Sequence, residues 1–210
     1  MKTSFFRFTV FFLAPFFILT LFFPGVSKAQ SRDYLTDEEI ELVRNSQEID
    51  KRIDVLIKAI DRRMAVLTNQ NWQPSKKEAD KWGELPSGSK SELLWDISRI
   101  LQKAIDDIDD LVSRQGIDDK VLGSDRKDEL DDETSRIIKT NKKNFAAAVH
   151  NLADASQRYL PTFENLLKTT TDKKEQGLIY GATESCNMII EASAKVDKPE
   201  SDKKKKNKGN

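Results

Sequence analysis

The feature that most constrains the fold of this chain is a stripe of large apolar residues spaced by four and three positions. Because an α-helix has about 3.6 residues per turn, this spacing places the side chains on one face of a helix. A single helix cannot bury such a face alone, so the pattern predicts helices packed against one another. The stripe consists of Ile49, Ile53, Leu56, Ile60, Met64 and Leu67.

A capping box marks where this first helix begins. Thr36 can accept a hydrogen bond from the backbone of Glu39, whose side chain can return a bond to the backbone of Thr36. Leu35 can also pack against Ile40 as a hydrophobic staple. Together with the apolar stripe, these signals predict one continuous helix over residues 36–68.

Three further helices are predicted downstream. Ser89 and Glu92 form a second capping box, which with Gly116 bounds a helix over residues 90–115. A third apolar pattern covers residues 130–167 and contains Pro161, which removes a backbone hydrogen bond and predicts a kink or short break near Leu160. A fourth helix is predicted to begin at Asp172, with its apolar face at positions 179, 182, 186, 189 and 193.

These patterns predict an all-α fold, an antiparallel four-helix bundle with long helices that occupies residues 30–196. The connection over residues 68–88 is long for a bundle, and connections of this kind often carry function. Gly177, Gly181 and Ser185 recur every four residues and predict a close approach by another helix. The predicted core consists of Ile53, Ile60, Ile97, Leu101, Ile105, Phe145, Val149, Leu152 and Ile189.

The first 29 residues are read separately from the bundle. They combine a basic start (Lys2 and Arg7), an apolar run, and small side chains at Ser27 and Ala29, which is typical of a secretory signal peptide cleaved after Ala29. The alternative is an uncleaved membrane anchor, because the apolar run approaches the roughly 20 residues that cross a bilayer. We therefore expect a protein exported to the periplasm or the exterior of a bacterial-type cell.

The last segment, residues 197–210, is rich in lysine and poor in apolar residues, so a disordered tail is predicted. It carries about +3, whereas the mature chain has a net charge near −3. Such a tail can bind an envelope polyanion or an acidic membrane surface, or serve only to keep the protein soluble. Its candidate binding residues are Lys203, Lys204, Lys205, Lys206 and Lys208.

A second basic candidate is the pair Arg62 and Arg63. Most charges of the first helix are explained by favourable pairs four positions apart, such as Glu48 with Arg52. Neither Arg62 nor Arg63 has an acidic residue four positions earlier. The pair is therefore interpreted as a residual basic patch on a solvated helix face, and as part of a candidate binding surface.

Trp72 and Trp82 are the remaining candidate binding residues. Both lie in the long connection over residues 68–88. Large aromatic side chains are usually buried, so the favoured interpretation is a lid folded over one end of the bundle. The alternative is an aromatic platform for a small ligand or a glycan.

The sequence gives little evidence for a catalytic site or a metal site. Asp118, Gly123 and Glu129 fit three positions of a calcium-binding EF-hand loop, but Lys120 and Leu122 occupy positions that need oxygen ligands. A solvated acidic loop is therefore predicted there, with weak calcium binding as the minor alternative.

The chain has one histidine and one cysteine. His150 is followed four residues later by Asp154, but no nucleophile motif accompanies them, so a surface histidine is predicted. Cys186 lies on an apolar face and is predicted to be a core residue. One His and one Cys cannot build a typical zinc, haem c or di-iron site, and no cofactor is expected.

The resulting expectation is a non-catalytic binding or structural component of the cell envelope. Its partner is expected to be a protein or an envelope polyanion, with no nucleic acid. Membrane contact is expected only during export or through the lysine-rich tail. The alternative is a bundle that binds a small ligand or a glycan through the segment between Trp72 and Trp82.

Overall fold

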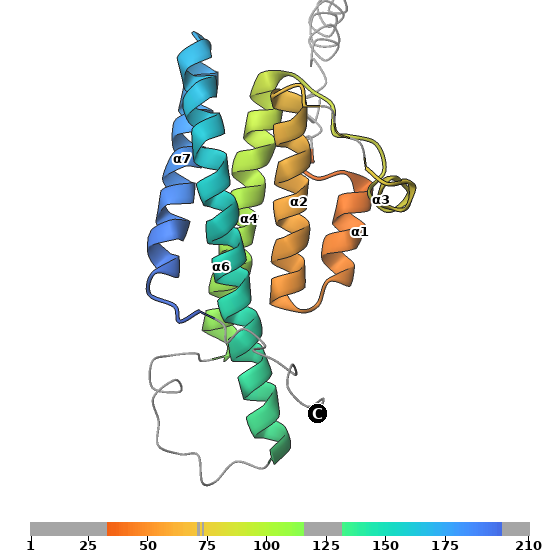
Figure 1. Cartoon of the computed structure of the whole chain (residues 1–210), viewed down its shortest axis with the longest axis vertical. Coiled ribbons are helices and arrows are strands. Elements are labelled where there is room, and N and C mark those ends of the chain that lie inside the picture. The colour runs from red at the N-terminus through yellow and green to blue at the C-terminus, as the bar shows by residue number, and fades with distance from the viewer. Residues whose placement is uncertain (1–32, 71, 73, 116–131, 199–210) are drawn as a thin grey trace, which may run out of the picture. The chain divides into compact units, whose positions relative to one another are not determined.

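The computed structural model describes residues 33–70, 72, 74–115 and 132–198, which form helices joined by turns and loops, with no strand among them (Figure 1). The all-α class is therefore confirmed. The signal segment, the acidic loop at 118–129 and the candidate lysines at 203–208 lie outside the described residues. The helices are α1 (Asp37–Asn45), α2 (Ile49–Leu67), α3 (Lys76–Trp82), α4 (Lys90–Gln115), α6 (Asp132–Thr169) and α7 (Lys173–Ser193).

Four long helices surround the core. Helix α2 packs against α4 and α6, and α7 packs against the same two helices (Figure 1). Seven of the nine predicted core residues are buried. Ile105 is only partly buried, although it packs against the core, and Phe145 is half-buried. None of the described helices combines the length and apolarity needed to cross a membrane.

The predicted first helix is wrong in one important respect, because it is two helices. A turn at residues 46–48 separates α1 from α2. Ser46 closes α1, since its amide donates to the carbonyl of Val43 at 3.2 Å and its hydroxyl donates to that of Leu42 at 2.8 Å. The Arg52 Nε then donates to the Ser46 carbonyl at 2.9 Å. The turn allows α1 to fold back along α2 (Figure 1).

Helix α3 was not predicted, although a sequence signal for it exists. Ser75 and Glu78 form a capping box, with the Ser75 hydroxyl accepting from the Glu78 amide at 3.3 Å. The helix ends at Gly83, whose φ of 63° lies in the left-handed region. This backbone conformation favours glycine, because it lacks the Cβ atom that makes positive φ costly for other residues.

The last helices differ from the sequence expectations in two respects. Helix α6 continues through Pro161, so the predicted short break is wrong, while the alternative of a kink stays a prediction. Pro161 and Gln157 are exposed, so water can bind the Gln157 carbonyl that loses its partner, while buried Tyr159 and Phe163 hold the helix in the core. Gly177 and Gly181 are exposed with no atom within 4 Å of an added Cβ, so no described helix approaches them.

The start of α7 and its cysteine agree with the predictions. The Asp172 side chain accepts hydrogen bonds from the amides of Lys174 at 2.8 Å and Glu175 at 3.0 Å. Cys186 is fully buried, and burial raises the pKa of its thiol to about 11. The thiol is therefore protonated and unreactive at neutral pH.

Candidate functional site

Arg62 and Arg63 do not form the surface patch that the sequence suggested. Both side chains are 1% exposed and are among the most buried large residues of the described structure. Both pair with Glu39 of α1, which is fully buried: Arg62 Nη1 lies 2.6 Å from Glu39 Oε1, and Arg63 Nη2 lies 2.9 Å from Glu39 Oε2. Their guanidinium groups are therefore internal ion-pair partners rather than contacts for an external anion.

Further hydrogen bonds and a second ion pair hold Arg63 in place. Arg63 donates to the carbonyl of Ala59 at 2.8 Å and to that of Tyr34 at 2.6 Å. Its Nε lies 3.4 Å from Asp96 Oδ2, and Asp96 is also buried. The ionic cluster of Glu39, Arg62, Arg63 and Asp96 thus contains two acids and two bases, which keeps the buried charge balanced.

Arg62 connects this ionic cluster to α3. It donates to the carbonyl of Glu84, and its guanidinium carbon lies 5.6 Å from the centre of the Trp82 ring. Burial lowers the pKa of Arg62, while the nearby carboxylate of Glu39 opposes that effect. The half-buried Trp82 ring is therefore held against a cation that is itself fixed inside the protein.

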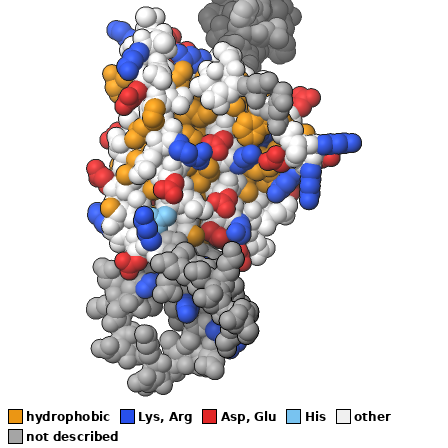
Figure 2. Space-filling view, in the orientation of Figure 1, with side chains coloured by type: hydrophobic (Ala, Val, Ile, Leu, Met, Phe, Trp, Pro, Cys, Tyr) orange, Lys and Arg blue, Asp and Glu red, His pale blue; other side chains and the backbone are white. Residues whose placement is uncertain are grey.

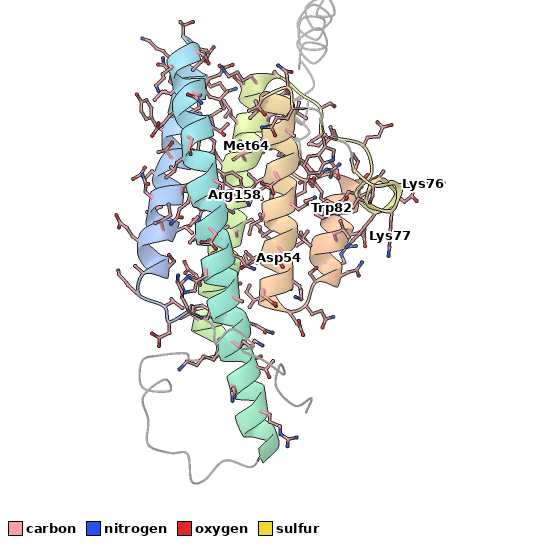
Figure 3. The ribbon with its side chains drawn as sticks, viewed as in Figure 1. Asp54, Met64, Lys76, Lys77, Trp82 and Arg158 are labelled. Atoms are coloured by element: carbon pink, nitrogen blue, oxygen red, sulfur yellow. The ribbon has the colours of Figure 1, made fainter. Side chains whose placement is uncertain are left out.

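Trp72 and Trp82 lie near neighbouring cations of α2. The Lys58 Nζ is 4.5 Å from the centre of the Trp72 ring and 3.3 Å from Glu78 Oε1. The hydrogen bond from Lys58 lowers the pKa of Glu78. Trp82 lies between α2 and α3, whereas Lys76 and Lys77 project from α3 away from α2 (Figure 3). The tryptophans thus pack over the side of α2, where each remains half-buried.

A groove of about 680 Å³ lies between the α1–α2 turn, α2 and α3. Trp82 supplies an aromatic wall, and the polar wall carries side chains of both charges. In the space-filling view, basic side chains also project at the edge formed by α3, whose Lys76, Lys77 and Lys81 are exposed (Figure 2). We call this surface the Trp82 groove. Its lining includes Ser46, Lys51, Asp54, Lys58, Lys81 and Trp82.

Two further polar side chains, His150 and Tyr159, bond within the protein. The His150 Nε2 lies 2.9 Å from the Val196 carbonyl, which ties α6 to the segment after α7. The Tyr159 hydroxyl donates to Asp61 Oδ1 at 2.7 Å, and burial raises the pKa of Tyr159 well above its ordinary value. The described residues contain no group of three or more His, Cys, Asp or Glu side chains that could hold a metal ion.

Of the sequence-predicted candidates, the structure brings Arg62, Trp72 and Trp82 together on one side of α2 and buries Arg63 beneath them. The sequence did not identify Lys51, Lys58 and Lys81 as site residues, although Lys51 and Lys58 recur seven positions apart, which is two helical turns.

Comparison of the chain with family models, curated proteins and solved structures finds no match.

Proposed function

We propose that the protein is a non-catalytic binding component of a bacterial-type cell envelope, and that it takes its ligand in the Trp82 groove. The scaffold in this proposal is an antiparallel four-helix bundle of α2, α4, α6 and α7, against which α1 and α3 form the groove. The observation that carries the proposal is a concave surface of about 680 Å³ beside a partly exposed tryptophan. This volume is in the range of ordinary ligand pockets.

The chemistry of the Trp82 groove favours a polar polymer with apolar faces, such as a glycan of the cell wall. A sugar ring can lie on the indole face while its hydroxyl groups bond to charged side chains. Lys51 and Lys81 can donate such bonds, and Asp54 can accept them. The interior anchor of Trp82 on Arg62 places the ring before the ligand arrives, which reduces the entropy lost on binding.

Binding is tested by isothermal titration of the purified protein with soluble fragments of cell-wall glycan. We expect Trp82→Ala to weaken binding about tenfold, which corresponds to about 1.4 kcal/mol of lost aromatic contact. Lys81→Ala, at an exposed position of the same groove, should also weaken it. Trp95→Phe is the matched control, because Trp95 packs edge-on against Tyr34 and does not line the groove. Equal affinity for all four proteins would contradict the proposal.

The envelope location in this proposal depends on residues 1–29. We expect the exported form to begin at Gln30, since Ser27 and Ala29 suit the signal peptidase. Intact mass spectrometry of the protein recovered from the cell exterior or periplasm measures this directly. A mass that retains residues 1–29 in a membrane fraction would instead support the N-terminal anchor.

A further inference from the structure

A second concave site lies beside the turn at residues 46–48, next to the N-terminal end of α2. This polar pocket has a volume of about 680 Å³ and is formed by α2, α4 and α6 with the turn itself. Its wall is mainly polar, in contrast to the aromatic wall of the Trp82 groove. Its lining includes Gln47, Arg52, Lys103, Asp107, Asn141 and Asn144.

Asp107 of α4 is the distinctive group of the polar pocket. Its side chain is only 8% exposed, and one oxygen, Oδ1, accepts a hydrogen bond from Lys103 and lies 3.9 Å from Arg52 Nη1. The other oxygen, Oδ2, is buried and has no hydrogen-bond partner among the described residues. An unpaired buried acceptor is unfavourable, so a donor that reaches this oxygen would stabilise the complex.

The surroundings of Asp107 indicate what kind of donor fits. Lys103 and Arg52 lie next to the Asp107 carboxylate, and Glu48 and Asp110 also line the pocket, so its charged side chains sum to about −1. This small net charge gives a cation only a modest electrostatic advantage. The neighbouring amides of Asn141 and Asn144 can both donate and accept hydrogen bonds, as can Gln47. A carboxylate, amides and a guanidinium in one pocket suit a neutral ligand that has several hydroxyl groups, each of which is both donor and acceptor.

We infer that this polar pocket binds a small neutral polyhydroxylated ligand, with Asp107 accepting from one hydroxyl and the α6 amides bonding to others. Contact with the unpaired oxygen requires the carboxyl group to rotate toward the pocket, which the broad, roughly two-fold torsion of aspartate allows. Arg52 donates to the Ser46 carbonyl through its Nε, which fixes the arginine at the edge of the site. The inference rests on this pocket alone and does not require the Trp82 groove to bind anything.

The test uses the purified protein labelled with ¹⁵N and the neutral disaccharides cellobiose and N,N′-diacetylchitobiose. We expect the side-chain amide signals of Asn141 and Asn144 to shift on titration with at least one of them. The double variant Asn141→Ala/Asn144→Ala should lower the affinity measured at backbone amides of the pocket at least about tenfold. Asn165→Ala is the matched control, because Asn165 is an exposed asparagine elsewhere on α6.

Three results would overturn the inference. They are the absence of any shift at the pocket with both sugars, equal affinity of the double variant and the control, and pocket shifts caused by choline but by neither disaccharide. Asp107→Asn adds an independent check, because it keeps the shape of the side chain but replaces one acceptor oxygen by a donor. We expect weaker sugar binding in this variant, with circular dichroism verifying that the helices remain. Unchanged sugar affinity in a folded Asp107→Asn protein would exclude the proposed contact.

Discussion

Replacement of Glu39 by alanine is expected to lower the free energy of unfolding by about 3–5 kcal/mol, the usual cost of removing one partner from a buried ion pair. The loss is large because Glu39 is the shared partner of Arg62 and Arg63, all three of which are almost completely buried. Without it, two guanidinium groups remain in the interior, and among the described residues the ion pair of Arg63 with Asp96 is the one that is left to them. Urea denaturation followed by circular dichroism measures the change.

The matched control is Glu41→Ala on the same helix. Glu41 pairs with Arg44, but both side chains are more than half exposed, so the change should stay within about 1 kcal/mol. Amide hydrogen exchange measures the local effect, because loss of Glu39 should accelerate exchange of the backbone amides of α1 more than those of α4. A loss in Glu39→Ala no greater than that in Glu41→Ala would show that the buried ionic cluster does not hold α1 in place.

The second large effect is expected for Phe163→Ala in α6. Phe163 is fully buried in the core, so its truncation removes a large apolar group and leaves a cavity. Substitutions of this type cost about 3–5 kcal/mol. Tyr180→Ala is the control, because this aromatic residue of α7 is 61% exposed and should change stability by less than about 0.5 kcal/mol. Comparable losses for both variants in chemical denaturation would contradict the assignment of Phe163 to the core.

The regular helices could be predicted because their signals are local. The capping box at Ser89 and the cap at Asp172 lie where α4 and α7 begin. The apolar stripe of α2 is buried as its spacing indicates, except for the partly buried Leu67 at its end. The capping box at Ser75 was equally local, so α3 could have been predicted with the same rule. The apolar pattern alone does not predict α3, because the segment is short of the apolar residues that usually identify a helix.

The break between α1 and α2 could not be read in the same way. Residues 46–48 are Ser, Gln and Glu, with neither glycine nor proline, so helix propensity gives little reason to stop there. The gain from breaking the helix is tertiary. In one straight helix Glu39 and Arg62 would be about 35 Å apart, whereas in the folded-back arrangement they form an ion pair of 2.6 Å.

The candidate site depended on this same tertiary contact. No acidic residue lies three or four positions from Arg62 or Arg63, and their partner Glu39 is 23 and 24 residues away. Trp82 was identified as a candidate from its type and its place in a long connection. Its position against Arg62, and the groove that results, depend on α1 and α3 both folding onto α2.

The most direct test of the Trp82 groove is a two-dimensional NMR titration that observes the three tryptophan indole groups. The chain has three tryptophans, so single replacements assign every indole signal. On addition of soluble cell-wall glycan fragments, we expect the Trp82 signal to shift most, that of Trp72 to shift less, and that of Trp95 to stay in place. A titration that leaves the Trp82 signal unchanged, or that moves only Trp95, would contradict binding in the groove.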